Sequence, residues 1–308
     1  MNPEVTSIGD INVDIITSKL KDMPQRDSQI ILPEIRLSSG GCAANFAKAI
    51  SKLGTAVRFI GKVGEDVFGD FLRDNLNGVD LRLLTGSKTG ITVAITFDDN
   101  TRSFITYPGS NSELKVKDID FSLIEGKCLH IASFFLQGLR ENTSEIMEYA
   151  HDNKMTVSFD TGWDPGGWSN EDTELVKNIL HNVDIFFPNI KEGKAITGAK
   201  DERGICRELL DLGPEVIGLK LGKMGCYVAT RDEGYYIPPF RVKPVDTTGA
   251  GDVFDAAFIL GYLRSWDLEK TGRFANAAAA LSTMGYGTER YPTEGEVRRL
   301  LLNQKSTE

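Results

Sequence analysis

Short apolar runs recur through this chain, and segments with apolar residues at helical spacing separate them. The runs lie at residues 57–61, 128–132, 156–160, 183–187 and 216–221. The helical segments lie at 43–53, 64–76, 143–153, 172–181, 253–263, 272–284 and 294–302. Repeated strand and helix units of this kind predict an α/β fold, with a Rossmann-like, mostly parallel central sheet flanked by helices.

Two segments, 11–37 and 89–107, have strand character but no helix beside them, and in the first the strands are expected at 11–16 and 29–37. The second contains two arms rich in β-branched and aromatic residues around a turn at 98–100, which is typical of a hairpin. Strands without helices predict a small sheet that projects from the main fold. Because no linker or fixed-period repeat divides the chain, we expect one domain over residues 1–308 with these strands inserted.

The composition limits the class of protein. With 41% hydrophobic and 26% charged residues, the 308-residue chain is typical of folded globular proteins. Its net charge of -9 argues against general binding to nucleic acids or membrane surfaces. The four cysteines and three histidines show no metal-ligand spacing. The N-terminal residues do not resemble a signal peptide, and no apolar stretch approaches the ~18 residues of a membrane span, so we expect a cytoplasmic protein.

The segment 245–258 joins a glycine-rich loop to a helix with an apolar face. The first N–H groups of a helix lack intrahelical partners, and Gly249, Ala250 and Gly251 would let an oxygen-rich ligand approach them. Asp252 follows this anion site and has two interpretations. It is either a helix cap or a general base that accepts a proton from an attacking hydroxyl during phosphoryl transfer. The spacing alone leaves both open.

The segment 5–16 predicts a first strand that ends at a turn at Gly9 and Asp10, and a second polar group follows this turn. Asn12 and Asp14 share a strand face at the position where open α/β sheets bind ligands, although a solvated strand face would look the same. Gly40 and Gly41 precede a helix whose first turn contains Asn45. The Asn45 amide can donate to and accept from a pair of hydroxyls, or it can make only local bonds at the helix start.

A third polar pair, Asn189 and Glu192, follows the predicted strand at 183–187. These residues suit a hydrated Mg²⁺, which binds few carboxylates together with substrate phosphates. The same spacing also suits a capping box at the start of a helix. The sequence leaves both interpretations open.

Several motifs resemble those of the ribokinase-like, or PfkB, family of carbohydrate and nucleoside kinases. They are D-T-T-G-A-G-D-V-F at 246–254, G-G-C-A-A-N-F-A at 40–47, G-x-D-x-x-G at 64–69 and N-x-x-E at 189–192. The resemblance covers essentially the whole chain. It implies a ribokinase-like fold with a small β-sheet lid and ATP-dependent phosphoryl transfer to a small sugar. Asp252 would be the general base, and the loop from Gly249 to Gly251 the anion hole.

The resemblance also implies roles for other residues. The sugar would be bound by Asp14, Asn12, Gly40, Gly41, Asn45 and Arg102. ATP would be bound by Asn189, Lys220, Gly222, Gly225, Thr248 and Asn276. Mg²⁺ would be held through water by Glu192, and a monovalent cation such as K⁺ by Asp246. The lid would also form the interface of a homodimer.

The acceptor is not fixed by these motifs. Cys42 stands where ribokinases have a lysine, and Ser133 follows the strand after which ribokinases carry a glutamate. A nucleoside kinase of the same family is therefore the alternative. A catalytically inactive sugar-binding protein is the non-enzyme alternative, although mere binding does not require the carboxylate of Asp252. A dinucleotide-dependent dehydrogenase is disfavoured because its G-x-G-x-x-G fingerprint does not follow the first strand.

Overall fold

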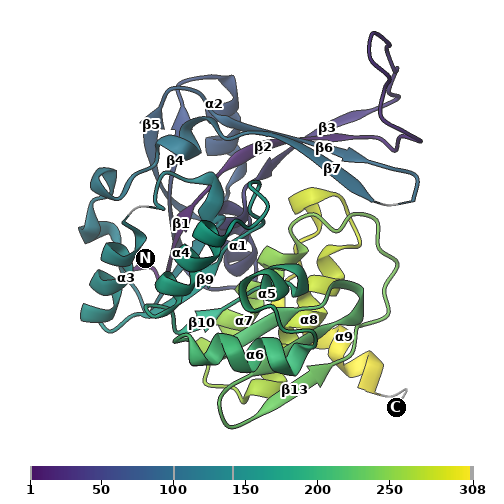
Figure 1. Cartoon of the computed structure of the whole chain (residues 1–308). Helices are drawn as coiled ribbons and strands as arrows, with labels where there is room; N and C mark the ends of the chain where they lie inside the picture. The colour runs from purple at the N-terminus through teal and green to yellow at the C-terminus, as the bar shows by residue number, and fades with distance from the viewer. Residues whose placement is uncertain (1, 100, 141, 306–308) are drawn as a thin grey trace.

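The computed structural model describes residues 2–99, 101–140 and 142–305. Its main feature is a nine-stranded sheet made of β1 (Val5–Gly9), β4 (Val57–Gly64), β5 (Asp80–Gly86), β8 (Cys128–Ala132), β9 (Thr156–Asp160), β10 (Ile185–Phe186), β11 (Val216–Lys220), β12 (Cys226–Ala229) and β13 (Gly234–Ile237) (Figure 1). The spatial order is β13-β12-β11-β10-β9-β8-β1-β4-β5. Neighbours from β11 to β5 pair in parallel, while β12 and β13 pair antiparallel. The predicted mostly parallel sheet is confirmed.

Helices cover both faces of this sheet. One apolar core lies against α1 (Cys42–Lys52), α2 (Val67–Asn75), α7 (Ala250–Leu263), α8 (Leu268–Ser282) and α9 (Glu294–Lys305). The other lies against α3 (Thr143–Asp152), α4 (Asn170–Leu180), α5 (Ile190–Thr197) and α6 (Glu202–Asp211). Side chains of β1 alternate between them, since Val5 belongs to the first core and Ile8 to the second. This two-sided burial explains why all residues of β1 and of β8 are buried.

Helix α6 was not among the predicted elements. Asp201 accepts a hydrogen bond from the N–H of Gly204 and so caps the helix. Its buried residues Ile205, Cys206, Leu209 and Leu210 lie at helical spacing. Both signals were present in the sequence.

The order of the strands reverses direction at β1. The chain continues outward from β4 to β5 on one side of β1, and from β8 through β11 on the other. Loops at the carboxyl ends of β1 and β8 therefore diverge, which is where open α/β sheets bind their ligands. The residues that follow Gly9 lie at this switch in strand order.

A separate small sheet contains β2 (Asn12–Thr17), β3 (Ile35–Gly40), β6 (Gly90–Thr96) and β7 (Arg102–Tyr107), in the order β3-β2-β6-β7. Two antiparallel hairpins, β2 with β3 and β6 with β7, are joined by the parallel pair of β2 and β6. Figure 1 shows this sheet extending from the central sheet over the C-terminal part of the chain. The predicted separate sheet and its second hairpin are confirmed. Asn100, in the predicted turn, lies outside the described residues.

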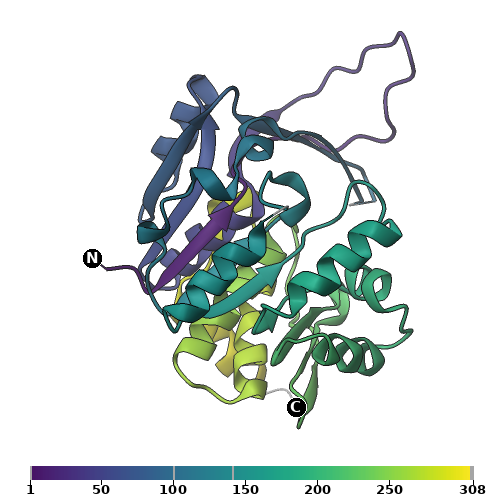
Figure 2. The same ribbon diagram turned by 60° about the vertical axis from the view of Figure 1, so that its left-hand side comes forward.

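The first hairpin differs from the prediction. Its second strand begins at Ile35, whereas strand character was expected from Gln29. Residues 18–34 instead form a long connection that extends away from the body of the molecule in both views (Figure 2). Pro24 and Pro33 lie in this connection, and proline cannot donate to the ladder of a sheet.

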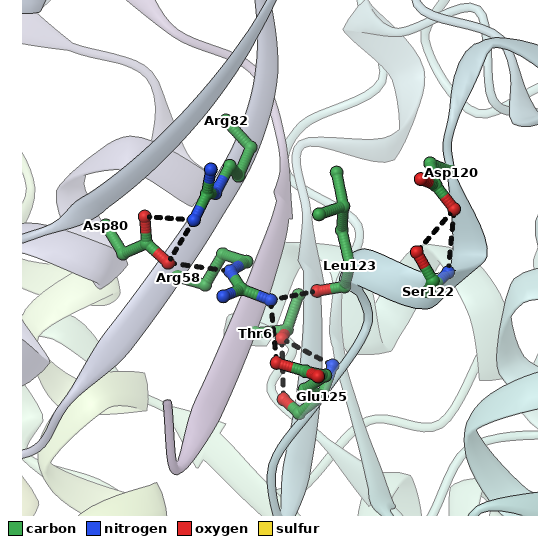
Figure 3. Close-up of polar contacts among 8 residues, drawn as sticks. All are labelled: Thr6, Arg58, Asp80, Arg82, Asp120, Ser122, Leu123 and Glu125. Atoms are coloured by element: carbon green, nitrogen blue, oxygen red, sulfur yellow. Dashed lines mark hydrogen bonds and ion pairs between the residues drawn. The ribbon is translucent and has the colours of Figure 1, made fainter. Parts of the chain in front are cut away.

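A buried arginine joins the amino ends of three strands (Figure 3). Arg58 of β4, whose side chain is 9% exposed, donates from Nε to Asp80 Oδ2 of β5 at 2.8 Å. Its Nη1 donates to Glu125 Oε2 at 2.9 Å and to the carbonyl of Leu123 at 3.0 Å. Thr6 of β1 donates to the carbonyl of Glu125 at 2.7 Å. Burial pulls the pKa of Asp80 upward, but the bond and charge of Arg58 hold that pKa below its ordinary value.

Two further observations concern the described part of the chain. None of its helices has the length and apolar content needed to cross a membrane. Its four cysteines are free thiols, and Cys42 is the one that is partly exposed.

Candidate active site

The glycine-rich loop leads directly into α7, as the sequence predicts. Gly249 is the N-cap of this helix and has a left-handed backbone with φ of 76°. A Cβ at this position would lie 2.5 Å from the hydroxyl oxygen of Tyr291, so only glycine fits. Because α7 packs against α1 and α8, its exposed first N–H groups are held in a fixed position.

Asp252 lies in the first turn of α7 and is 7% exposed. Asn45 of α1 donates from Nδ2 to Asp252 Oδ2 at 2.8 Å, so the two glycine motifs meet at this carboxylate. Burial raises the pKa of Asp252 well above its ordinary value, and the charge of Asp160 raises it further. The Asn45 bond and the charge of Lys220 act in the opposite direction. A carboxyl group with a raised pKa is better matched to proton abstraction near neutral pH.

A buried ion-pair cluster lies beneath the loop. Lys220, the last residue of β11, donates from Nζ to Asp160 Oδ2 at 2.7 Å and to Asp255 Oδ1 at 3.1 Å. A Cβ on Gly251 would lie 3.6 Å from the same nitrogen. Burial pulls the pKa of Asp160 upward, but Lys220 and a hydrogen bond with Asp255 bring it below its ordinary value. Burial raises the pKa of Asp255 well above its ordinary value.

Asn189 and Glu192 form a reciprocal capping box at the start of α5. Asn189 Oδ1 accepts from the N–H groups of Lys191 and Glu192 at 2.9 and 3.1 Å. Glu192 Oε2 accepts from the N–H of Asn189 at 2.8 Å, and Oε1 contacts Asn189 Nδ2. Burial, together with the charge of Asp160, raises the pKa of Glu192 to about 7. The helix-cap interpretation is confirmed, while the metal and ATP roles stay predictions.

Asp14 is buried where the small sheet meets the central one. A Cβ on Gly40 would lie 2.1 Å from Asp14 Oδ2, and a Cβ on Gly41 would lie 2.6 Å from the carbonyl oxygen of Asp10. Both glycines therefore allow close backbone approach, and Gly41 also has φ of 95°. Burial raises the pKa of Asp14 to about 7, with smaller contributions from the charges of Asp10 and Asp246.

Two residues that support this region were missed in the sequence. Asp10 Oδ1 accepts from the N–H of Ala43 at 3.1 Å and so satisfies the start of α1. Asn111 donates from Nδ2 to Asn12 Oδ1 at 2.6 Å and accepts from the N–H of Ile11 at 3.0 Å. The Asn12 amide oxygen therefore already has a protein partner. Asp10 directly follows the first predicted strand, which is a signal that the sequence offered, whereas Asn111 lies about a hundred residues from its partners.

Arg102 joins the small sheet to the loop before α7. Its guanidinium contacts the carboxylate of Asp246 and the hydroxyl of Thr248. Asp246 also accepts from the N–H groups of Thr248 and Gly287 at 2.8 and 2.9 Å. The side chains of Arg102 and Asp246 are 13% and 5% exposed. Burial pulls the pKa of Asp246 upward, but these backbone bonds and the arginine charge hold it below its ordinary value. Contacts of Arg102 with the acceptor and of Thr248 with ATP stay predictions.

A cavity of about 660 Å³ lies on the other side of the loop. Four predicted ATP-binding residues line it, namely Lys220, Gly222, Gly225 and Asn276, together with Ala250 and Gly251 of the loop. Apolar side chains such as Phe240, Val242 and Ala279 form much of the remaining wall. Asn276 Nδ2 donates to the carbonyl of Pro238 at 2.8 Å. Asn189 and Thr248 do not belong to this lining.

The geometry places three groups in sequence across the sheet edge. The cavity opens onto Gly251, Asp252 follows Gly251 in the first turn of α7, and Asn45 connects Asp252 to the side where Asp14 lies. A phosphorylated ligand in the cavity would present its terminal group to the loop amides. A hydroxyl beside Asp252 could then attack that group in line.

Comparison with known proteins gives consistent results. The model of the "pfkB family carbohydrate kinase" matches residues 2–294. The chain is 31% identical to an ATP-dependent ribose-1-phosphate kinase of Halopiger xanaduensis, with 96% of this chain and 97% of the relative covered. It is 30% identical to a 5-dehydro-2-deoxygluconokinase of Clostridium perfringens, with 86% and 84% covered. Among solved structures it resembles an Arabidopsis thaliana ribokinase complexed with ribose and ATP, at 25% identity and a TM-score of 0.80, with 98% and 99% covered.

Proposed function

Because this chain belongs to the pfkB family of carbohydrate kinases, we propose that it transfers the γ-phosphoryl group of ATP to a hydroxyl of a small sugar. One observation carries this proposal. Asp252, buried and bonded to Asn45, directly follows the glycine loop that lines the large cavity. A proton acceptor, an anion-binding helix start and a ligand cavity are therefore adjacent.

In this proposal Asp252 accepts the proton of the acceptor hydroxyl as its oxygen forms a bond to the γ-phosphorus. The bond between that phosphorus and the bridging oxygen breaks, and ADP leaves. The amides around Gly249 to Gly251 stabilise the charge that develops on the transferring group. Asp14, with the backbone exposed at Gly41, would hold further hydroxyls of the acceptor and orient the reacting one.

The nucleotide would occupy the cavity of about 660 Å³. Its phosphates would reach the loop beside Gly251, and its base would lie against the apolar wall near Asn276 and Ala279. The relatives named for ATP-dependent activity and for a complex with ATP support ATP as the donor.

Mg²⁺ fits this site as an ion that arrives with the nucleotide. The described residues contain no group of three or more His, Cys, Asp or Glu side chains able to hold a metal alone. Mg²⁺ usually keeps several waters and binds one or two carboxylates plus substrate phosphates. Glu192, whose oxygens are engaged by Asn189, would contribute through water. When bound, the ion would neutralise charge on the phosphates.

A monovalent cation at Asp246 fits less well. Two backbone N–H groups and the Arg102 guanidinium already surround this carboxylate. We infer that the arginine supplies the positive charge here, so that K⁺ is not required.

We also propose that one kinase domain spans the chain and that the small sheet is its lid. The sheet exposes large apolar side chains on its outer strands, including Ile35, Leu37, Phe104 and Ile105, which are 53–58% exposed. A second copy of the chain would cover these side chains in a homodimer. Light scattering should give the mass of a dimer for the wild type and that of a monomer for the Leu37→Lys, Phe104→Lys double variant. A monomer mass for the wild type would contradict this dimer.

The function is tested by ADP release. Purified protein with ATP and Mg²⁺ would be offered D-ribose, 2-deoxy-D-ribose, D-fructose, 5-dehydro-2-deoxygluconate, ribose 1-phosphate and nucleosides, with Asp252→Asn as the blank. Acceptor-dependent ADP with a sugar supports the proposal. Preference for a nucleoside favours a nucleoside kinase instead. Binding of a sugar without ADP from any acceptor would favour an inactive binding protein.

A further inference from the structure

The Tyr291 side chain is a buried polar group that the proposed reaction leaves unused. It lies between α8 and α9 and is 4% exposed. Within the described residues, its hydroxyl has no hydrogen-bond partner. Burying a hydroxyl without a partner is unfavourable, so native proteins rarely keep one that has no purpose.

This hydroxyl points into the candidate active site. A Cβ built on Gly249 would lie 2.5 Å from the Tyr291 oxygen and 3.6 Å from Asn45 Nδ2. The oxygen is therefore beside the N-cap of α7, on the side where Asn45 binds Asp252. Burial raises the pKa of Tyr291 well above its ordinary value, and the charges of Asp252 and Asp14 raise it further. The phenol thus remains a hydrogen-bond donor at neutral pH.

The neighbouring groups indicate which acceptor would pair with the Tyr291 hydroxyl. The Asn45 amide is already engaged with Asp252. Asp14 and Asp252 are predicted to face the acceptor, and both accept hydrogen bonds when ionised. A polyol between these two carboxylates donates its hydroxyl protons to them and has oxygen lone pairs left over. The Tyr291 hydroxyl supplies a neutral donor for such an oxygen.

We propose that Tyr291 is a specificity-determining residue whose hydroxyl donates a hydrogen bond to a hydroxyl oxygen of the acceptor other than the one that is phosphorylated. The inference rests on the proposed kinase function and deepens it. It selects acceptors that carry this second hydroxyl, because an analogue without it leaves the buried phenol unpaired.

The test compares the wild-type chain with Tyr291→Phe on D-ribose, 2-deoxy-D-ribose and 3-deoxy-D-ribose. If another sugar is the better acceptor in the ADP screen, its monodeoxy forms replace these. We expect the wild type to lose about 10-fold in kcat/KM on the analogue that lacks the contacted oxygen. Tyr291→Phe should lose most of that discrimination while its KM for ATP stays unchanged.

Thermal stability provides a readout that does not require activity. Tyr291→Phe removes an unpaired buried hydroxyl, so its Tm should equal or exceed that of the wild type. Tyr235→Phe is the control, because the Tyr235 hydroxyl, in β13, donates to Glu233 Oε2 at 2.8 Å. That variant should have a slightly lower Tm and unchanged discrimination among the sugars.

Unchanged ratios for every deoxy analogue in Tyr291→Phe would overturn the inference whatever the Tm, and a lowered Tm beside them would show a purely structural role. Failure of the kinase function is a different result, namely no ADP from the wild type with any acceptor. In that case the increase in Tm caused by D-ribose still tests the contact. A smaller increase in Tyr291→Phe than in the wild type supports it, and an equal increase overturns it.

Discussion

The central sheet carries a buried cation at each of its two edges, and the surroundings of these cations differ. Arg58, at the amino edge, pairs with Asp80 and Glu125, whose side chains are 35% and 52% exposed. Lys220, at the carboxyl edge, pairs with Asp160 and Asp255, whose side chains are 7% and 1% exposed. Water can therefore solvate the carboxylates that pair with Arg58, but it has little access to those that pair with Lys220.

The pKa values follow this difference. The pKa of Asp80 is lowered by Arg58 against the effect of burial, so this cluster is matched in charge within the folded chain. Burial raises the pKa values of Asp252 and Asp255, and that of Glu192 to about 7, so the Lys220 region has more carboxylates than its single ammonium can balance. The Arg58 cluster therefore stabilises the fold. The Lys220 region lowers the stability of the fold, and its carboxylates are available to a ligand.

The largest effect is expected from Asp252→Asn. Loss of the general base should lower kcat at least ~10²-fold, while ATP binding is retained. The Tm at pH 7.5 should not fall, because a neutral amide replaces a buried carboxylate and can still accept the Asn45 bond. Steady-state kinetics and thermal unfolding check both outcomes. A variant with near-normal kcat would show that another group takes the proton.

Arg58→Met should lower stability and leave activity unchanged, which is the opposite of the result expected for Asp252→Asn. It leaves Glu125 without its cation and Asp80 with only the exposed Arg82, and it should lower the free energy of unfolding by about 1–3 kcal/mol, a value limited by the exposure of those carboxylates. Its KM values should match those of the wild type. Arg82→Met is the control, since Arg82 is 46% exposed and its pair with Asp80 should contribute little. Denaturant unfolding of the three chains gives the comparison, and equal midpoints for all three would contradict it.

Arg102→Met tests whether the arginine at Asp246 acts as a built-in cation. Without it the buried carboxylate keeps its backbone donors but loses the guanidinium charge, and we expect kcat/KM for the acceptor to fall about 10-fold, equivalent to about 1–2 kcal/mol. Added KCl should restore part of this loss, whereas choline chloride at the same ionic strength should not. Strong K⁺ stimulation of the wild type would instead show that the cation site is separate from Arg102.

A further expected effect is a pH dependence of stability at Asp14. Its pKa is about 7 in the folded chain and near 3.8 when unfolded, so the folded state binds more protons between these values. Wild-type stability should therefore decrease as pH rises from about 4 to 7, and that of Asp14→Asn should decrease less, because only its other buried carboxylates, such as Glu192, still titrate. The Tm advantage of Asp14→Asn should therefore grow from pH 5 to pH 8, and thermal unfolding at both pH values measures it.

Asp80→Asn provides the opposite sign for that measurement. The lowered pKa of Asp80 means that its stabilising ionisation is complete above its ordinary pKa of 3.8. The Tm of Asp80→Asn should therefore lie below that of the wild type by a constant amount between pH 5 and pH 8. This difference should become smaller only in more acidic solution. A deficit that changes as much as the Asp14→Asn advantage would refute the contrast between the two edges.

Local patterns in the sequence were sufficient for much of the fold. Apolar runs and helical stripes predicted the parallel strands, and the glycine loop before α7 was predicted together with its helix. The strand expected from Gln29 starts later, at Ile35, because Pro33 cannot contribute a donor to a ladder. Helix α6 could have been predicted from its Asp201 cap and apolar spacing.

The site was less predictable, because its contacts join segments that are far apart. The Arg102 guanidinium reaches Asp246 across 144 residues, and Lys220 gathers Asp160 and Asp255 from two other elements. The spacing of residues along the chain does not predict contacts over such distances. In the sequence, Tyr291 cannot be distinguished from an ordinary core residue. Its proposed role at the acceptor site follows from its unpartnered hydroxyl, which the structure alone shows.

The contact between Asn45 and Asp252 has a consequence for how the protein is made. These residues are 207 positions apart, and the central strand β1 must wait for β8 to complete its pairing. As the ribosome releases the chain from its N-terminus, the first glycine motif emerges long before the second. The nascent chain therefore has no assembled site until α7 has emerged, so a ribosome-bound fragment that ends before this helix should neither bind nor consume ATP. Long-range pairing of this kind also slows folding, because distant segments must meet before their contacts stabilise the chain.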